Sequence, residues 1–319
     1  MANEDDNYNE YNSSEWDLDT HLKKRGIPFK SINSEEPEGQ FELGRMYYDV
    51  QDYKQAFYWY KKAAENGHIE AQLNLGLLYY NEKGVEQSYE NAAKWFTLAA
   101  EQGDEAAQYD LAGMHYDGEG VEQNYEEAFK WYKLAAEQGH VEAQFVLGKC
   151  YFCGWGVEQD YAEAEKWFEK AVDNGYDIAE ITSWFIDWDD EASEEELKHI
   201  LIWYQWAADE GDMDAQNILG HRYYEGNGVE KNLNKALEYF RKYFDDNTLI
   251  IENDVVYSSD KSIIYDYCGT DIDFYEIPDF VKKICKWAFN NHVKSVSVSK
   301  DCEIEDYAFG DDVEIIRRK

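Results

Sequence analysis

Small and large apolar side chains recur along most of the chain with the spacing of packed helices. An aromatic ladder repeats every 36 residues, and the position after each of its members is also aromatic. Alanine stands three residues before the ladder position, or five after it, in most copies. The ladder consists of Trp59, Trp95, Trp131, Trp167, Trp203 and Tyr239. This pattern predicts one closely packed helix per copy, and we expect the ladder to lie in the core.

A second signature, Ala-Gln-x-x-Leu-Gly, follows the same period and predicts another helix in each copy. An earlier version at Gly39 lies 32 residues before Ala71, and a divergent version starts at Ala179. In the second copy we expect the first helix over 70–81 and the second over 88–102. The clear versions of the signature start at Ala71, Ala107, Ala143 and Ala215.

Glycines divide each copy into two helices. A pair such as Gly118 and Gly120 follows the first helix, and a single glycine such as Gly103 follows the second. Glycine tolerates the positive φ that ends a helix or forms a tight loop. One helix pair cannot bury its apolar face alone, whereas stacked pairs can. The sequence therefore predicts an all-α solenoid of six helix pairs over residues 37–250, with a small β-containing C-terminal cap.

The repeat, Ala-Gln-x-x-Leu-Gly with its Gly-x-Gly loop and Trp-Tyr pair, resembles the Sel-one-like repeats, which are related to the tetratricopeptide repeats. The resemblance covers about residues 39–250 and is strongest in the second to fourth copies. It implies a right-handed superhelix that acts as a scaffold for protein complexes without catalysis. It does not identify the partner.

The fifth copy, residues 179–214, keeps its length but has an acidic run at 187–196 in place of the glycine loop. We reject a calcium-binding EF-hand there, because Ala192 replaces the turn glycine and Lys198 replaces the closing acid. Ser193 and Glu196 instead predict a capping box that starts a helix running through Trp206.

Residues 251–319 lose the helical period and are richer in β-branched side chains. Ile277-Pro278 with Ala288-Phe289 is followed twenty residues later by Ala308-Phe309. This spacing resembles two BspA-type leucine-rich repeats, and Val296 and Val298 alternate with serines as in a strand. Two such repeats are too few to fold alone, so we expect them to dock on the last helices. For residues 1–36 we expect a flexible acidic segment with a short helix near 15–25.

The chain carries a formal net charge of −38, most of it within the repeats. Such a field repels nucleic-acid backbones and favours basic partners, although it also simply increases solubility. No apolar run is long enough to span a membrane, and the acidic N-terminus does not resemble an export signal. Five cysteines without regular spacing suit a reducing compartment. We therefore expect a cytoplasmic protein that binds neither membranes nor nucleic acid directly.

The sequence contains no arrangement that indicates catalysis, a cofactor or a metal site. Cys150 and Cys153 have a metal-like spacing, but no second pair of ligands accompanies them, so we interpret them as structural. The seven histidines are scattered, and the glycine pairs recur once per repeat as turn residues. We expect a protein that is not an enzyme.

The related tetratricopeptide repeats bind partners on an inner, concave wall built by the first helices. By position, three columns of first-helix residues would form this wall here, with acids such as Asp49 and Asp117 beside the third column. The first column is Phe41, Leu73, Tyr109, Phe145, Ile181 and Asn217. The second column is Arg45, Leu77, Gly113, Lys149, Phe185 and His221. The third column is Tyr48, Tyr80, Tyr116, Phe152, Trp188 and Tyr224.

These columns predict two functions that remain open at this point. Aromatic side chains beside acids suit a partner peptide with apolar anchors and basic residues. Alternatively, many of the rings simply pack against the neighbouring repeat. Separately, the acid-rich surface suggests a mimic of nucleic acid that occupies a basic site on a DNA- or RNA-binding protein. A protein-interaction scaffold is the leading hypothesis and acidic mimicry is the second.

Overall fold

The computed structural model describes residues 33–189, 192–269, 271–289, 293–310 and 312–318. The chain forms two compact units, one ending at Tyr176 and the other starting at Asp177. The short helix that we expected near 15–25 lies outside the described residues, as do two residues of the acidic run in the fifth copy.

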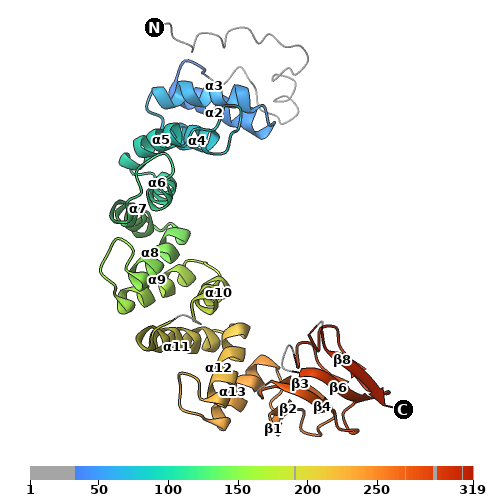
Figure 1. Cartoon of the computed structure of the whole chain (residues 1–319). Helices are drawn as coiled ribbons and strands as arrows, with labels where there is room; N and C mark the ends of the chain where they lie inside the picture. Colours follow the sequence, from blue (N-terminus) through green and yellow to red (C-terminus); the bar gives the residue numbers. More distant parts are fainter. Residues whose placement is uncertain (1–32, 190–191, 270, 290–292, 311, 319) are drawn as a thin grey trace. The chain divides into compact units, whose positions relative to one another are not determined.

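From residue 33 onwards, the described part of the first unit forms four successive helix pairs (Figure 1). The predicted helices of the second copy are confirmed to within one or two residues, at Ile69–Tyr80 and Tyr89–Glu101. Only three residues join the first pair, against eight in the second. The helices are α2 Pro37–Asp49, α3 Tyr53–Glu65, α4 Ile69–Tyr80, α5 Tyr89–Glu101, α6 Glu105–Asp117, α7 Tyr125–Gln138, α8 Val141–Cys153 and α9 Tyr161–Asp173.

Polar side chains fix where these helices begin. Ser88 accepts a hydrogen bond from the backbone N–H of Asn91 at the start of α5, and Asp104 accepts one from Ala107 at the start of α6. These side chains satisfy N–H groups that have no partner within the helix. Histidine does the same at α4 and α8, where the Nδ1 atoms of His68 and His140 accept from the backbone.

The core of each pair is a ring of the second helix packed on a small residue of the first. Phe96 lies against Gly76, and Phe168 lies against Gly148, where an added methyl carbon would come within 2.5 Å of the ring. The aromatic residue after each ladder position is buried in all six copies. The expectation of a core ladder is only partly right, because Trp203 and Tyr239 are buried whereas Trp59, Trp95, Trp131 and Trp167 are half-buried.

The glutamine of the repeat signature links three helices. The Gln108 side chain donates to the carbonyl of Ala100, at the end of α5, and accepts from Gln138, at the end of α7. Gln72 and Gln144 make the same two kinds of bond one repeat away on either side. Each glutamine is buried, so these bonds satisfy polar groups that would otherwise be costly to bury. The first unit is thus tied together repeat by repeat.

The second unit begins with two further helix pairs, with α10 and α11 in the divergent copy. The predicted capping box is present, since Ser193 and Glu196 each bond the other's backbone N–H. The helices are α10 Ile178–Asp189, α11 Glu194–Asp209, α12 Met213–Glu225 and α13 Leu233–Tyr243.

The described residues after α13 form eight short strands in two sheets, of order β1-β2-β3-β5-β7 and β4-β6-β8. From β3 onwards successive strands alternate between the two sheets, and the pairing of Ile264, Ile284 and Ile304 repeats every twenty residues. The predicted strand around Val296 and Val298 is confirmed, and the β-branched residues near Val255, Ile263 and Ile315 also lie in strands. The assignment to BspA-type repeats stays a prediction. The strands are β1 Ile250–Glu252, β2 Val255–Tyr257, β3 Ile263–Tyr267, β4 Ile272–Glu276, β5 Lys283–Ile284, β6 Val293–Ser299, β7 Glu303–Ile304 and β8 Glu314–Arg318.

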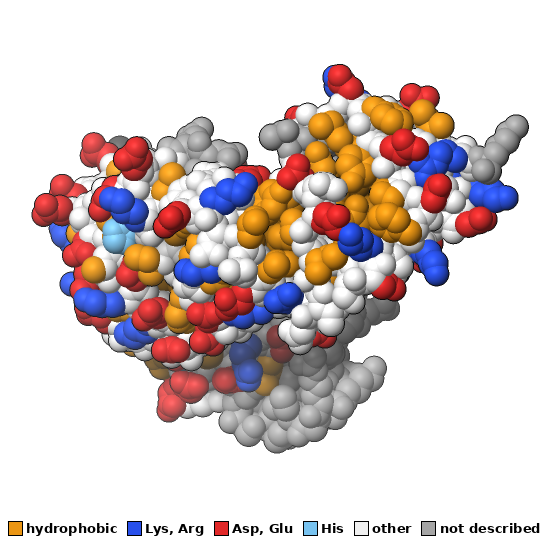
Figure 2. All heavy atoms as spheres, turned by 90° about the horizontal axis from the view of Figure 1, so that it is seen from below, with side chains coloured by type: hydrophobic (Ala, Val, Ile, Leu, Met, Phe, Trp, Pro, Cys, Tyr) orange, Lys and Arg blue, Asp and Glu red, His pale blue; other side chains and the backbone are white. Residues whose placement is uncertain are grey.

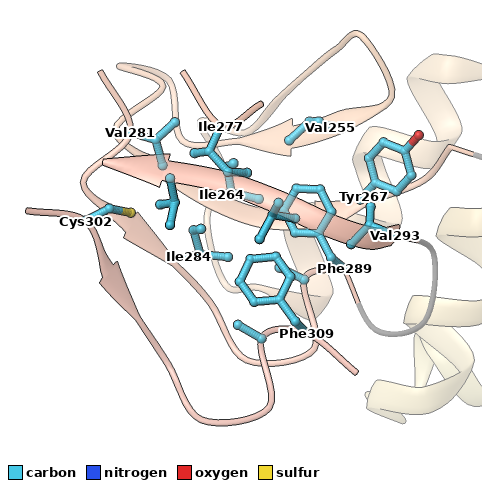
Figure 3. Close-up of a cluster of buried hydrophobic side chains, with 14 of the residues drawn as sticks. Val255, Ile264, Tyr267, Ile277, Val281, Ile284, Phe289, Val293, Cys302 and Phe309 are labelled. Atoms are coloured by element: carbon cyan, nitrogen blue, oxygen red, sulfur yellow. The ribbon is translucent and has the colours of Figure 1, made fainter. Parts of the chain in front are cut away.

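The strand segment has its own apolar core and also packs on the last helix pair. Inside it, the rings of Phe289 and Phe309 stack at 5.3 Å beside the buried Ile264 and Ile284 (Figure 3). Towards α12 and α13, a second cluster contains Tyr224, Phe240, Leu249, Val256 and Cys268. The strands therefore cover apolar surface that the last helix pair would otherwise expose to solvent.

Candidate pocket on the first-helix face

A pocket of about 320 Å³ opens between the first helices of the second and third repeats, α4 and α6. It joins all three predicted columns, with Tyr109 from the first, Leu77 and Gly113 from the second and Tyr80 from the third. We call it the α4–α6 pocket. Its remaining lining residues are Asn81, Phe96, Asp110, Met114, Asp117 and Tyr132.

Asp110 is the unusual residue of this pocket. Burial, together with the smaller effect of the nearby charge of Asp104, raises the pKa of its carboxyl group to about 6. No described residue donates a hydrogen bond to this carboxylate or forms an ion pair with it. A half-buried acid without a partner loses hydration that nothing in the protein replaces. The carboxylate is therefore available to a hydrogen-bond donor or a cation that enters the pocket.

The aromatic walls of the pocket are held in place by neighbouring side chains. The Tyr80 hydroxyl donates to Glu119 at 2.7 Å, and this bond together with burial raises the pKa of Tyr80 to about 12. The Tyr109 ring stacks on His140 with centroids 4.6 Å apart. Fixed rings of this kind offer large contact area with little loss of conformational freedom on binding.

Two other members of the first column, Phe41 and Phe145, stack on rings as Tyr109 does. Phe41 lies on His68 at 4.5 Å, and Phe145 lies on Tyr176 at 4.7 Å. Leu73 is half-buried against the core of the second and third repeats. These side chains combine packing between repeats with a partly exposed surface.

The third column also contacts the next repeat. Lys83 donates to the Tyr48 hydroxyl at 2.8 Å, and the Tyr116 ring meets Trp155 at 5.3 Å. Phe152, in contrast, is only 2% exposed and packs edge-on against Tyr161. It leaves no surface for a partner, and we remove it from the predicted binding residues.

Two predicted residues of α12 are covered by the strand segment. Tyr224 is buried, and its hydroxyl donates to Asp254. His221 lies 2.9 Å from the carboxylate of Asp266 on β3. Burial lowers the pKa of His221, but the hydrogen bond and charge of Asp266 outweigh that effect and raise it overall. Both side chains join the helices to the strands and are corrected to structural residues.

The second column holds cations in two other repeats of the first unit. Arg45 is exposed and pairs with Glu42 at 2.7 Å. Lys149 is half-buried, with its Nζ atom 5.2 Å from the Phe145 ring centroid and 5.8 Å from that of Trp155. Its pKa is lowered by burial. In the third repeat the same column has Gly113, which leaves the space that the pocket occupies.

Sequence reasoning missed one group of metal-type ligands, in which atoms of His221, Asp266 and Cys268 lie within 4.8 Å of one another. Three donors are fewer than a closed zinc site uses, and burial raises the pKa of the Cys268 thiol strongly. Burial likewise raises the pKa of Cys150 to about 12. Thiols of this kind stay protonated near neutral pH and are poor metal ligands.

Stacked helix pairs with a buried glutamine tie between repeats define an α-solenoid of the tetratricopeptide-like class. The model of the Sel1 repeat matches residues 37–68, 69–104, 105–140, 141–176 and 214–242, which together are more than half of the chain. The chain therefore belongs to the Sel1 repeat family, which confirms the predicted resemblance. The family model does not match residues 177–213, which contain nearly all of the divergent copy.

Two solved structures illustrate the likeness. The protective antigen c5321 of uropathogenic Escherichia coli, which has the same repeat fold, is 31% identical over 72% of this chain, with a TM-score of 0.51. A Sel1 repeat protein from Oxalobacter formigenes is 29% identical over 65% of this chain and 85% of its own, with a TM-score of 0.48. This chain covers 49% of the antigen, so it spans about half the length of that relative.

No curated protein matches this chain. Among the residues that the structure describes, no helix is both long and apolar enough to cross a membrane.

Proposed function

We propose that this chain is a non-catalytic scaffold that binds a partner protein or peptide on the first-helix face of its N-terminal unit. The α4–α6 pocket carries the proposal, because it is hollow, partly apolar and lined by three columns that recur along that face. Sel1 repeat proteins generally act as protein–protein interaction scaffolds. Apolar and aromatic side chains line this pocket together with the polar side chains of Asn81, Asp110 and Asp117, so it offers apolar contact beside negative charge.

The partner has apolar anchors and basic residues in this proposal. Leu73, Leu77 and Tyr109 offer apolar contact, and Asp110 and Asp117 offer negative charge beside it. We also propose that the protein acts in the cytoplasm. Its five cysteines are free thiols, as is usual in a reducing compartment.

Acidic mimicry of a nucleic acid has weaker support. Figure 2 shows acidic side chains spread over the visible face with basic and apolar side chains between them. A mimic of a phosphate backbone needs a regular line of negative charge that basic side chains do not interrupt. Several acids are also engaged with lysines, as in the pair Glu127 and Lys130 at 2.6 Å.

The test uses a matched pair of leucine substitutions in the full chain, with capture of partners from cells that express it. Leu77→Gln alters the pocket, whereas Leu134→Gln alters an exposed leucine of the second-helix face. We expect the first substitution to abolish capture of a protein that the wild-type chain and Leu134→Gln both retain. Mass spectrometry identifies the protein, and circular dichroism checks that both variants keep their helix content.

Equal capture by Leu77→Gln and the wild type would contradict a role for this face. Capture that disappears between low and moderate salt, and that is indifferent to Leu77→Gln, would favour acidic mimicry instead.

A further inference from the structure

In the first repeat, the acidic side chains of the first helix surround an arginine of the same helix. In α2 the Arg45 guanidinium donates to Glu42 at 2.7 Å. The hydrogen bond with Glu42 and its charge raise the pKa of Arg45, and the charges of Asp49 and Tyr60 add to this effect. One arginine thus stands among two carboxylates and a tyrosine.

The third repeat has the same surroundings without the arginine. Counting along the repeat, Asp110 takes the place of Glu42, Asp117 that of Asp49 and Tyr132 that of Tyr60. Gly113 takes the place of Arg45. The α4–α6 pocket is lined by all four of these residues, so the space beside the acids is open.

We propose that the α4–α6 pocket binds the guanidinium group of an arginine side chain from the partner, which takes the position that Arg45 has in the first repeat. This inference rests on the proposed function and specifies its chemistry. The Asp110 carboxylate accepts hydrogen bonds from the guanidinium, and the Tyr80 and Tyr109 rings pack beside its planar face. Arginine suits such a site because its flat, weakly hydrated group combines stacking with paired hydrogen bonds.

Three observations favour a single cationic side chain over other occupants. The pocket volume, about 320 Å³, is at the low end for ligand sites, which fits one side chain. The fourth repeat also has a cation at the equivalent position, Lys149, between two aromatic rings. The carboxylates of Asp110 and Asp117 exclude an acidic occupant, since each would repel it at close range.

The experiment titrates the full chain, labelled with ¹⁵N, with N-acetyl-arginine methylamide and follows amide chemical shifts. The same titration with N-acetyl-citrulline methylamide provides a neutral probe of nearly the same shape, and the lysine derivative provides a second cation. A probe of this size binds weakly, with a Kd on the order of millimolar. We expect saturable shifts for Tyr80, Tyr109 and Gly113 with the arginine probe, and none that saturate with citrulline.

Three variants test the contacts. Asp110→Asn keeps the size of the side chain and removes its charge, so we expect the arginine probe to bind at least about tenfold more weakly. Gly113→Arg supplies an internal guanidinium, as in α2, and we expect it to abolish probe binding. Glu101→Gln removes an exposed acid at the end of α5 and serves as the matched control, with binding within about twofold of the wild type.

Equal binding of the citrulline probe, or of the arginine probe to Asp110→Asn, would overturn the proposal, as would equal binding of the lysine probe. Asp110→Asn gives this answer even if Gly113→Arg disturbs the fold. The probe requires no partner, so a negative result leaves the capture experiment with Leu77→Gln intact. Loss of capture in that experiment, combined with no binding of the arginine probe, would retain the scaffold and reject the arginine site.

Discussion

At the scale of single residues, the α4–α6 pocket depends on a local exchange in the repeat signature. Other repeats have glycine followed by a larger residue, such as Gly44-Arg45 and Gly148-Lys149, whereas the third has Ala112-Gly113. Ala112 and Tyr132 are buried in the same apolar cluster of the third repeat, and a methyl group added at Gly113 would lie 3.6 Å from the Tyr132 hydroxyl. Gly113 then leaves open the space that a longer side chain fills elsewhere.

The raised pKa of Asp110 predicts that this residue affects the free energy of unfolding in a pH-dependent way. Its pKa is about 6 in the folded protein and about 4 in an unfolded chain, so folding favours the protonated form. The ionised carboxylate therefore lowers stability above pH 6, and this penalty fades as the pH falls towards 4. We expect Asp110→Asn to raise the free energy of unfolding by about 1 to 2 kcal/mol at pH 7.5, and by less at pH 4.5.

Urea unfolding of the wild type and Asp110→Asn at the two pH values measures this difference. A variant that is no more stable than the wild type at pH 7.5 would show that the carboxylate is well solvated.

The residues of this site were only partly predictable from the sequence. The columns identify Leu77, Tyr80, Tyr109 and Gly113, because repeat position fixes which face of a helix a residue is on. Asp110 is one position beyond the first column, and its importance arises from burial that a periodic pattern does not show. The sequence did contain a signal. In the first repeat an acid, Glu42, precedes Arg45 by three residues, whereas in the third repeat the equivalent acid, Asp110, precedes Gly113.

At the scale of helices and strands, close packing of four of the described helix pairs depends on a glycine beneath an aromatic ring, at Gly44, Gly76, Gly148 and Gly220. Two neighbouring repeats allow a matched test. In Gly148→Ala the new methyl group would lie 2.5 Å from the Phe168 ring, whereas in Gly113→Ala it would lie 3.6 Å from the Tyr132 hydroxyl. Both changes favour the helix by about 0.5 to 1 kcal/mol. Only the first forces the helices apart, at a cost of about 1 to 3 kcal/mol.

We therefore expect chemical denaturation to show that Gly148→Ala is less stable than the wild type and that Gly113→Ala is at least as stable. Equal effects of the two substitutions would mean that the ring can move aside without loss.

The helices were predictable because each carries a period of its own and polar residues or glycines at its ends. The C-terminal strands were predictable only as short β-branched runs. Their arrangement depends on pairing between segments twenty residues apart, such as Ile284 with Ile304, and on contact with α12. Such contacts also explain why His221 and Tyr224 were predicted to lie on the binding wall. Repeat position alone does not reveal that the strand segment covers them.

At the scale of the whole molecule, the division after Tyr176 predicts that the first unit folds by itself. Its four helix pairs contain the buried rings, the glutamine ties and the pocket. We expect a chain that ends at Tyr176 to keep its helical circular dichroism signal and to unfold cooperatively on heating. A chain that ends at Glu158 serves as the control. It lacks α9, exposes Gly148 and Leu147, and should melt at a lower temperature.

A gradual, noncooperative loss of helix in the chain that ends at Tyr176 would show that the second unit is required for the first to fold.

The exchange of Arg45 for Gly113 between repeats has a consequence for how such proteins acquire specificity. In a repeat that keeps its own arginine, that side chain already occupies the position beside the acids. In a repeat with glycine there, the position is open to an arginine of the partner, so a single substitution can create or remove the binding site. Glycine at residue 45 would free Glu42 and Asp49 of their arginine, but no earlier helix among the described residues lies before α2 to supply the opposite wall. The site therefore needs a neighbouring first helix as well as the lost arginine, and stacking of repeats determines where along the chain such a site can form.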